Sequence, residues 1–415
     1  MATRDILLHL TLAVLIGAGC GSPGSRAAEL DSVKAPPPAA SPARESKEMV
    51  RWKKPDLAEG PAIPLAQRGV VVALMRWGVT TLAVFDVGSA KMIPLATKET
   101  GALMVSQRAN RLAYLVREGA NPAKNHIEIL DWRNGRTLVV EPVDDDAVLG
   151  FTLDLEGKQL GYAAMNLRNS RSTHVTWRVG LLDLERQGAR IAVDSAAEKI
   201  HEEGVPVPFE WSGRTGRIYL QGWSPFRGMT RESIWGINPE RGDPSKILAA
   251  ANYVGTPRLA PDGARLSYLS SDRGSLPPDY VAVPGAPPGN RLSVMDLTTG
   301  EEATWSRGGE NTYGAYTWSA SGDEIVAVEQ AWLKGRFRDA EIRRIGKGTS
   351  LSLAKIDQSQ TVKQVASILE CRDRNLFWVE TDQASAKLYA NQERSPQVLF
   401  EFPNGALQLL GCLNR

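Results

Sequence analysis

The final apolar stretch of the chain, Leu409-Leu410-Gly411-Cys412, matches the pattern of Ile368-Leu369-Glu370-Cys371, cysteine included. In the earlier copy a polar turn and a second apolar strand, Asn375-Leu376-Phe377-Trp378, follow. After Cys412 the sequence stops at Arg415, so the second strand of this last copy has to come from elsewhere. The stretch Gly69-Val70-Val71-Val72 lacks a first strand before it. The sequence therefore predicts that the C-terminal strand pairs with the N-terminal unit.

The same strand–turn–strand pattern recurs along the chain. Its turns carry residues that tolerate positive φ and close hairpins, such as Pro261-Asp262-Gly263 and Glu156-Gly157-Lys158. The complete copies begin at Leu103, Phe151, Phe209, Pro257, Tyr316 and Ser367. A second hairpin follows each copy and is marked by an Asp or Asn after an apolar stretch. These markers are Asp86, Asp131, Asp183, Asn238, Asp296, Asp357 and Asn391.

The two patterns and the closing strand agree on seven units. Each unit is about 50 residues long, which lies in the range of propeller blades. A ring of blades joined by its terminal strands leaves no free sheet edge at the joint. We therefore expect an all-β, seven-bladed β-propeller over residues 65–415, closed by pairing of the C-terminal strand with the N-terminal blade. Six or eight blades, or a β-sandwich of unrelated hairpins, are the alternatives.

One copy of the hairpin, Leu259-Ala260-Pro261-Asp262-Gly263-Ala264-Arg265-Leu266-Ser267-Tyr268, resembles the Pro-Asp-Gly repeat of TolB-like, WD40-like (PD40) bacterial β-propellers. The resemblance implies the propeller fold and, for TolB itself, six blades behind an α/β domain and a role in an envelope complex. The seven units of this chain differ from that arrangement. The resemblance therefore supports the fold, and the Tol role is not carried over.

The composition excludes several classes of function. Lys and Arg number 49 against 47 Asp and Glu, so the net charge of +2 supplies no strong field for nucleic acid. Three Cys and four His are too few for a cysteine-rich metal scaffold. His126, His174 and His201 lie in different units, and Asp144-Asp145-Asp146 lacks the spacing of a calcium loop, which favours a solvated acidic turn. We predict neither a metal nor a cofactor.

The N-terminus has the pattern of an export signal. Residues 6–18 form an apolar run after Arg4 that is too short for a comfortable membrane span. The run ends in Gly17-Ala18-Gly19-Cys20, which resembles a bacterial lipobox and implies a signal peptide over 1–19 and lipidation of Cys20. Gly21 in place of Asp implies, by the rule for that class, the periplasmic face of the outer membrane. The alternative is ordinary secretion with cleavage after Ala27, giving a secreted or soluble periplasmic protein.

Residues 20–64 are expected to be a tether. Eight prolines interrupt Ala, Ser and charged residues without apolar periodicity, a composition that cannot bury a core. Membrane contact is therefore expected through the lipid anchor alone, in the bacterial cell envelope.

The segment 330–348 is expected to be a loop between the second and third strands of one blade. It combines aromatic residues with six basic residues against Asp339 and Glu341, a composition typical of interaction hot spots. The alternative is a loop that folds its apolar residues, including Ile342 and Ile345, back onto its own blade. The residues predicted to bind the partner are Trp332, Lys334, Arg336, Phe337, Arg338, Arg343 and Arg344.

The sequence favours a binding function over catalysis. It contains no Gly-x-Ser-x-Gly elbow of the kind that accompanies propellers in serine peptidases. We therefore expect a non-enzymatic scaffold that binds an envelope protein or polymer. The alternative is a propeller lyase or hydrolase acting on a glycan or peptide at the central channel. The polar residues expected on the inner strands form no recognisable triad: Ser106, Thr152, Asp154, Glu210, Arg258, Thr317 and Glu370.

Cys371 and Cys412 occupy matching positions at the ends of innermost strands in adjacent blades. An oxidising compartment would allow a disulfide between them. Adjacent inner strands can also stand too far apart for that bond. Two buried free thiols packing as small apolar residues are therefore the slightly favoured alternative.

Overall fold

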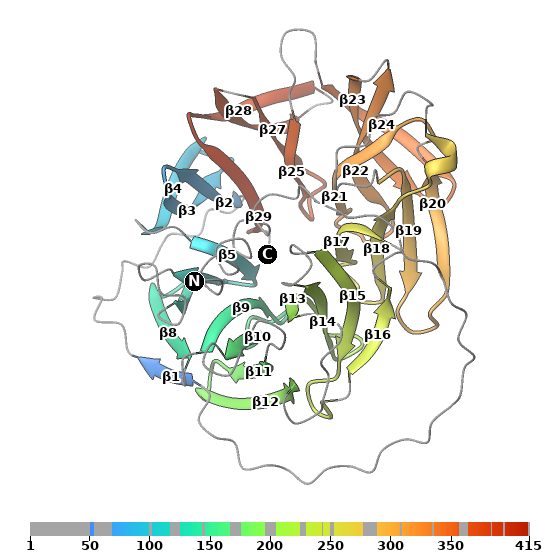
Figure 1. The fold of residues 1–415 in the computed structure, drawn as a ribbon. Helices are drawn as coiled ribbons and strands as arrows, with labels where there is room; N and C mark the ends of the chain where they lie inside the picture. Colours follow the sequence, from blue (N-terminus) through green and yellow to red (C-terminus); the bar gives the residue numbers. More distant parts are fainter. Residues whose placement is uncertain are drawn as a thin grey trace, which may run out of the picture.

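The described residues form a ring of seven antiparallel sheets (Figure 1). The computed structural model describes residues 50–53, 69–98, 102–116, 125–142, 146–166, 176–195, 205–224, 230–242, 244–249, 253–276, 289–307, 309–333, 336–356, 364–382, 384–392 and 395–413. Apart from β-strands they include a short 3-10 helix, η4 (Arg273–Ser275). The predicted seven-bladed, all-β propeller is confirmed, and six blades, eight blades or a sandwich are excluded.

Each blade runs from an innermost strand at the channel to an outermost strand, and its strands are named in that order. The first blade is β29 (Ala406–Cys412), β2 (Gly69–Arg76), β3 (Val79–Asp86) and β4 (Lys91–Lys98). The second is β5 (Ala102–Arg108), β6 (Arg111–Val116), β7 (His126–Asp131), β8 (Arg136–Pro142) and β1 (Val50–Lys53). The third is β9 (Asp146–Leu153), β10 (Gln159–Asn166), β11 (Trp177–Asp183) and β12 (Gly188–Asp194). The fourth is β13 (Val205–Ser212), β14 (Arg217–Ser224), β15 (Thr230–Ile237) and β16 (Pro244–Leu248).

The remaining three blades follow the same order. The fifth is β17 (Val254–Leu259), β18 (Arg265–Ser270), β19 (Arg291–Asp296) and β20 (Glu302–Arg307). The sixth is β21 (Thr312–Trp318), β22 (Ile325–Leu333), β23 (Arg336–Gly346) and β24 (Thr349–Ile356). The seventh is β25 (Gln364–Glu370), β26 (Leu376–Thr381), β27 (Ser385–Gln392) and β28 (Ser395–Pro403).

The second strands of the blades form the core. They read as almost continuous apolar runs because both faces of each blade are covered by its neighbours, as β2 with six consecutive buried residues illustrates. In five blades the second strand buries a large aromatic side chain, whose size fills the space between blades. These side chains are Tyr114, Tyr162, Tyr219, Tyr268 and Trp378.

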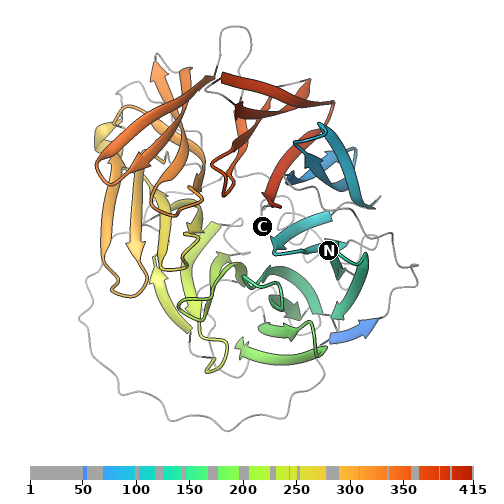
Figure 2. The same cartoon turned by 180° about the vertical axis from the view of Figure 1, so that it is seen from behind.

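The ring closes as the sequence predicts. β29 pairs antiparallel with β2, with Val70 opposite Cys412 and Val72 opposite Leu409. The C-terminal strand therefore supplies the inner strand of the blade that the N-terminal strands build, and Figure 2 shows the red and blue ends of the sequence side by side.

Six of the seven Asp and Asn markers lie where the third strand turns into the fourth. The Asp183 side chain accepts hydrogen bonds from the backbone N–H groups of Glu185 and Arg186, and Asp296 does the same for Thr298 and Thr299. Such side-chain bonds replace a backbone turn, which is why Asp and Asn recur there. The same bonding is made by Asp86, Asp131 and Asn238.

The prediction that Asp357 marks the turn between the third and fourth strands of the sixth blade is wrong. The turn between the third and fourth strands of that blade lies at Lys347 and Gly348, between β23 and β24. β24 itself ends at Ile356, and Asp357 lies outside the described residues.

The two faces of the ring differ in what they carry. The turns within strand pairs one–two and three–four, such as 154–158 and 87–90, lie on one face, which we call the turn face. The turns between second and third strands, such as Trp77-Gly78, and the ends of the fourth strands lie on the opposite face, which we call the connection face. The two sets of turns separate in this way because the strands alternate in direction within every blade.

The stretch expected to be a tether contributes a strand. β1 pairs with β8 as a fifth strand of the second blade, with Val50 opposite Pro142. Val50 is buried in the cluster that also contains Val140 and Ile127. The expectation that all of 20–64 lies outside the propeller is therefore wrong at residues 50–53, because Val50 finds an apolar site at the outer edge of the sheet.

Candidate partner-binding surface and inner-strand residues

Residues 330–333 and 336–346 lie in the paired strands β22 and β23 and not in the predicted loop. The two strands pair antiparallel with a register shift between Ala331 and Trp332, and Leu333 lies opposite Arg336. The hairpin turns between second and third strands, so its tip is on the connection face. The side chains of Trp332, Lys334, Arg336, Phe337 and Arg338 lie outside the described residues.

Arg343 and Arg344 are held within the protein. Arg343 forms ion pairs with Glu329 at 3.1 Å and Glu341 at 3.2 Å. Arg344 reaches the neighbouring blade and pairs with Glu370 at 2.5 Å. These two arginines therefore stabilise the blade and its contact with the next one, which separates them from the other predicted partner-binding residues.

Ile342 and Ile345 on the same strand are buried. For this part of the segment, the alternative in which apolar residues pack onto their own blade is correct. The physical reason is the alternation of the strand, which directs Ile342 into the core cluster with Val326 and Val328.

Polar residues of the inner strands bond to the next blade. The Ser106 hydroxyl accepts the backbone N–H of Leu153, the last residue of the neighbouring inner strand, at 3.1 Å. Ser367 repeats this contact with the backbone N–H of Leu409 at 3.1 Å. These hydroxyls therefore occupy backbone donors at the inner edges of the blades.

Charged inner-strand residues also join blades. Arg108 of the second blade pairs with Glu210 of the fourth blade at 2.5 Å. Glu370 accepts hydrogen bonds from Arg344 and from the backbone N–H of Ala320, both of the sixth blade. Burial raises the pKa of Glu370, and these two donors oppose that effect. The negative charge at Glu370 is thus compensated by the neighbouring blade.

The other predicted inner-strand residues do not gather into one site. Burial raises the pKa of the Asp154 carboxyl, which accepts the backbone N–H of Gln159 inside its own turn. Thr152 is buried in β9, Arg258 is exposed on β17, and Thr317 lies opposite Val326 in the sixth blade. Among the described residues, these groups form no nucleophile–base pair.

A buried polar cluster between the first two blades was missed in the sequence. The carboxylate of Glu128 accepts hydrogen bonds from Lys98 Nζ at 2.8 Å and from the Tyr114 hydroxyl at 2.8 Å. His126 Nε2 lies 3.3 Å from the same carboxylate. Burial alone would raise the pKa of Glu128, but the bonds from His126, Lys98 and Tyr114 outweigh it and lower the pKa to about 2. The carboxylate therefore stays charged and holds Lys98 of one blade against the next.

Asp146 is also part of a blade. The expectation of a solvated acidic turn is wrong for this residue, which is buried at the start of β9. Its carboxylate accepts the Asn166 side-chain N–H at 2.8 Å and lies 3.4 Å from Arg178. Asp144, Asp145, His174 and His201 lie outside the described residues.

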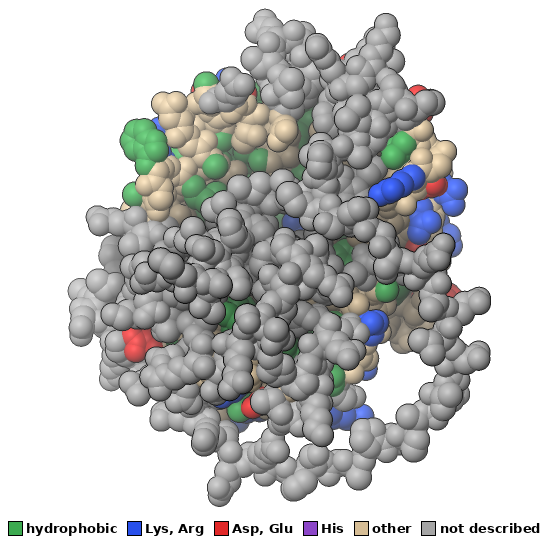
Figure 3. Space-filling view, viewed as in Figure 1, with side chains coloured by type: hydrophobic (Ala, Val, Ile, Leu, Met, Phe, Trp, Pro, Cys, Tyr) green, Lys and Arg blue, Asp and Glu red, His purple; other side chains and the backbone are tan. Residues whose placement is uncertain are grey.

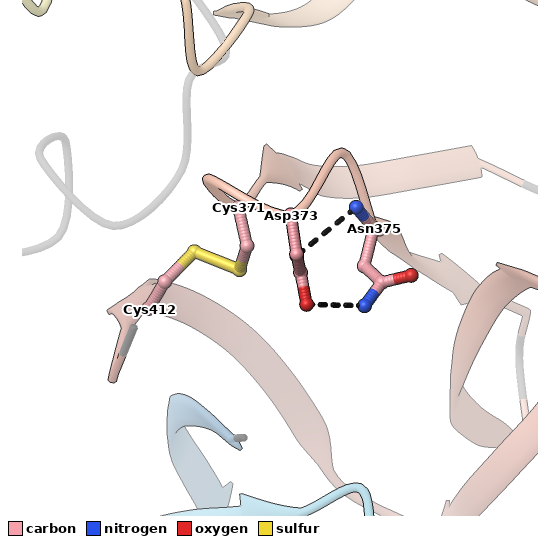
Figure 4. Close-up of a disulfide and its surroundings, with 4 residues drawn as sticks. All are labelled: Cys371, Asp373, Asn375 and Cys412. Atoms are coloured by element: carbon pink, nitrogen blue, oxygen red, sulfur yellow. Dashed lines mark hydrogen bonds between the residues drawn. A yellow bond between two sulfur atoms is a disulfide. The ribbon is translucent and has the colours of Figure 1, made fainter. Parts of the chain in front are cut away.

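Cys371 and Cys412 are joined by a disulfide (Figure 4). Their Cα atoms are 5.7 Å apart, within the range such a bond requires. The slightly favoured alternative of two free thiols is therefore wrong in this structure. The turn after Cys371 is fixed as well, because Asp373 accepts the backbone and side-chain N–H groups of Asn375. The bond fastens the closing strand to the seventh blade on the turn face.

The described part of the chain contains no cluster of three or more His, Cys, Asp or Glu side chains placed to hold a metal ion. Within the same ranges, no helix has the length and apolar character needed to cross a membrane. On the side seen in Figure 3, the Lys and Arg side chains of described residues lie mainly toward the right, where Figure 1 places the fifth and sixth blades.

Similar solved structures are propellers of differing activity. An oligogalacturonate lyase in complex with manganese aligns with a TM-score of 0.53 and 13% identity, over 75% of this chain and 82% of that chain. The propeller domain of the trilobed protease from Pyrococcus furiosus gives 0.48 and 10% identity, over 71% of this chain and 81% of that chain. TolB from Acinetobacter baumannii aligns with a TM-score of 0.42 and 13% identity, over 80% of this chain and 79% of that chain.

No protein family matches the sequence, and no curated protein is significantly similar to it. At such low identity the structural likenesses show the fold alone, and their mixture leaves both catalysis and binding open.

Proposed function

We propose that this chain is a non-catalytic scaffold of the bacterial cell envelope that is anchored through a lipid on Cys20 and binds an envelope protein or polymer through its connection face. The observation that carries the proposal is the use of the polar inner-strand residues. Ser106, Ser367, Arg108 with Glu210, and Glu370 are engaged in contacts between blades. These inner-strand groups thus support the scaffold.

The hairpin β22–β23 is the proposed contact region for the partner. Its tip combines Trp332 and Phe337 with Arg336 and Arg338, and Trp and Arg dominate the binding energy of many interfaces. Arg343 and Arg344 are left out of this region because both are paired with carboxylates of the propeller.

The disulfide supports export. Such bonds persist in oxidising compartments and are rare in the cytosol. A chain with Cys371 joined to Cys412 is therefore compatible with the expected signal peptide over residues 1–19 and with a location at the periplasmic face of the outer membrane.

Replacement of Cys20 tests the anchor. We expect Cys20→Ser to leave an unprocessed or soluble exported form, read by membrane fractionation and by the mass of the N-terminal peptide. If Cys20→Ser fractionates with membranes as the wild type does, the lipid anchor is refuted.

Replacement of the hairpin tip tests the binding region. We expect Trp332, Arg336, Phe337 and Arg338 changed together to Ala to abolish crosslinking to the partner in intact cells, with a nearly unchanged melting temperature. The matched control is Arg343→Ala, which removes a paired arginine of the same strand. Retained crosslinking in the fourfold variant would contradict the proposal.

An enzyme acting at the central channel is the second candidate. The observation in its favour is the raised pKa of Asp154 and Glu370, since carboxyls shifted by burial occur in catalytic sites. Turnover of oligosaccharides or peptides by the purified chain that is abolished by Asp154→Asn would support it.

A further inference from the structure

The turn between β2 and β3 exposes a tryptophan at an unfavourable backbone position. Trp77 is 85% exposed and has a φ of 49°, followed by Gly78 at 84°. Two consecutive positive φ angles are typical of a two-residue hairpin turn in which Asn-Gly is the preferred sequence. A bulky residue in this conformation costs of order 1–2 kcal/mol. Neither the exposure nor the conformation of Trp77 stabilises the fold, which points to a role outside it.

Arg76, next to this turn, contacts the neighbouring blade. The guanidinium of Arg76 lies 5.4 Å from the ring centroid of Trp77 and 4.9 Å from that of Phe402 in the neighbouring blade. The same guanidinium donates a hydrogen bond to the carbonyl of Pro403. Because Arg76 connects the first and seventh blades, Trp77 is presented from a fixed point of the ring.

The N-terminal segment joins the propeller on the same face. Val50 lies opposite Pro142, the last residue of the fourth strand of its blade, and therefore at the connection face. Trp77 lies there too, because Met75 of β2 pairs with Ala406, where the closing strand begins. Residues 20–49 precede Val50 in the sequence, and the tether expected from their composition would span about 30 Å as a coil of that length. An anchored lipid on Cys20 would thus keep this face close to the bilayer.

We propose that Trp77 inserts into the headgroup region of the bilayer and brings the first-blade side of the connection face against it, apart from the β22–β23 hairpin of the sixth blade. This inference rests on the proposed lipid anchor at Cys20. A tryptophan ring with one polar N–H suits the membrane–water interface. A protein partner is the less favoured occupant, because Trp77 is a single exposed large apolar side chain in its turn.

Quenching of tryptophan fluorescence by brominated lipids tests the docking. The acylated chain is reconstituted into vesicles of phosphatidylethanolamine and phosphatidylglycerol with or without bromine on the acyl chains. We expect bromine to quench part of the wild-type emission, and Trp77→Asn to reduce that quenching at least twofold. Trp77→Asn keeps the fold because Asn-Gly suits the turn, which its melting temperature verifies. The matched control is Leu351→Asn, which removes an exposed side chain (62%) on the outer strand β24 and leaves the quenching unchanged.

Flotation of the same vesicles reads the anchor separately. Flotation of wild type and Trp77→Asn alike, with equal quenching or none in both, overturns the docking and leaves the anchor in place. Failure of the wild type to float refutes the anchored function and the docking with it. Loss of a protein crosslink in Trp77→Asn without a change in quenching assigns the tryptophan to a protein partner and also overturns the proposal.

Discussion

The turn face and the connection face are built from the same strands but use their residues differently. On the turn face, Asp183 and Asp296 bond to the backbone of their own turns, and Cys371 is joined to Cys412. On the connection face, the exposed Trp77 sits in a strained turn and the N-terminal segment joins the ring. The turn-face side chains named here hold the ring, whereas the exposed ring of Trp77 on the connection face is not needed for it.

Substitutions on the two faces should therefore have different effects. Changes on the turn face should lower the free energy of unfolding and leave binding intact. Changes at the connection-face surface should alter binding with little loss of stability, or even a gain.

Removal of the disulfide should have the largest effect. The bond closes a loop across a sequence separation of 41 residues. On the chain-entropy model, Cys371→Ser with Cys412→Ser should lower the free energy of unfolding by roughly 3–4 kcal/mol. Urea unfolding measures this loss, and thiol titration of the denatured, unreduced protein verifies the bond. An unchanged unfolding midpoint would contradict the role of this face.

The buried cluster around Glu128, beneath the connection face, should make the free energy of unfolding depend on pH. The pKa of Glu128 is about 2 in the folded protein against a reference value of 4.5, so the unfolded chain takes up the proton first as the pH falls. This shift corresponds to a contribution of at most about 3 kcal/mol, which residual solvent screening reduces. The contribution is complete above pH 4.5 and is lost between pH 4.5 and 2.

Urea unfolding of the wild type and Glu128→Gln over this pH window measures the effect. The stability difference between the two should shrink as the pH falls. Glu240→Gln, in an exposed turn, is the control. A difference that stays constant down to pH 2 would show that Glu128 does not hold the two blades together as a carboxylate.

Loss of one side-chain-capped turn should have a smaller effect. Asp296→Ala removes the acceptor for the N–H groups of Thr298 and Thr299 and should lower the free energy of unfolding by about 1 kcal/mol. Thermal unfolding measures it, with Glu301→Ala in the same turn as control. Equal melting temperatures for Asp296→Ala and the wild type would show that these turns do not stabilise the turn face.

The substitution with the smallest expected effect, Trp77→Asn, should stabilise the fold, unlike the substitutions above. Trp77→Asn relieves a positive φ at a bulky residue and should raise the free energy of unfolding by roughly 0.5–1 kcal/mol. Trp77→Ala lacks the tolerance of Asn for this conformation and should gain less. Thermal unfolding of the two variants beside the wild type measures the order. Destabilisation by Trp77→Asn would mean that the ring of Trp77 packs for stability.

The closure of the ring could be predicted because both strands that form it, at the C-terminus and near the N-terminus, have a recognisable sequence pattern. The match between the stretches ending at Cys371 and Cys412 fixes the inner strand, and the apolar run Val70–Val72 identifies its partner. The turns between third and fourth strands could be predicted in most blades, because Asp and Asn recur where a side chain replaces backbone bonding, but the marker Asp357 of the sixth blade was wrong.

The role of Arg343 and Arg344 in the sixth blade was predicted wrongly because both arginines are paired with carboxylates of the propeller. Arg343 lies beside Glu329 of β22, and Arg344 beside Glu370 of another blade. Along the sequence these residues form a basic cluster typical of a surface loop. Glu329 and Glu370 are distant in sequence from the arginines they pair with, so only the three-dimensional structure shows these two contacts.

The polar cluster at Glu128 could be read only in part. His126 and Glu128 alternate along a strand and so share a face, which the sequence indicates. Lys98 comes from the preceding blade. Its approach depends on how neighbouring blades pack, which a linear pattern does not contain.

Site-specific photo-crosslinking in intact cells tests the central claim most directly. A benzoylphenylalanine is placed either at Phe337, on the connection-face hairpin, or at Leu155, an exposed apolar residue in a turn of the turn face. We expect a covalent adduct with an envelope component from position 337 and none from position 155. An adduct from position 155, or from neither position, would contradict binding through the connection face.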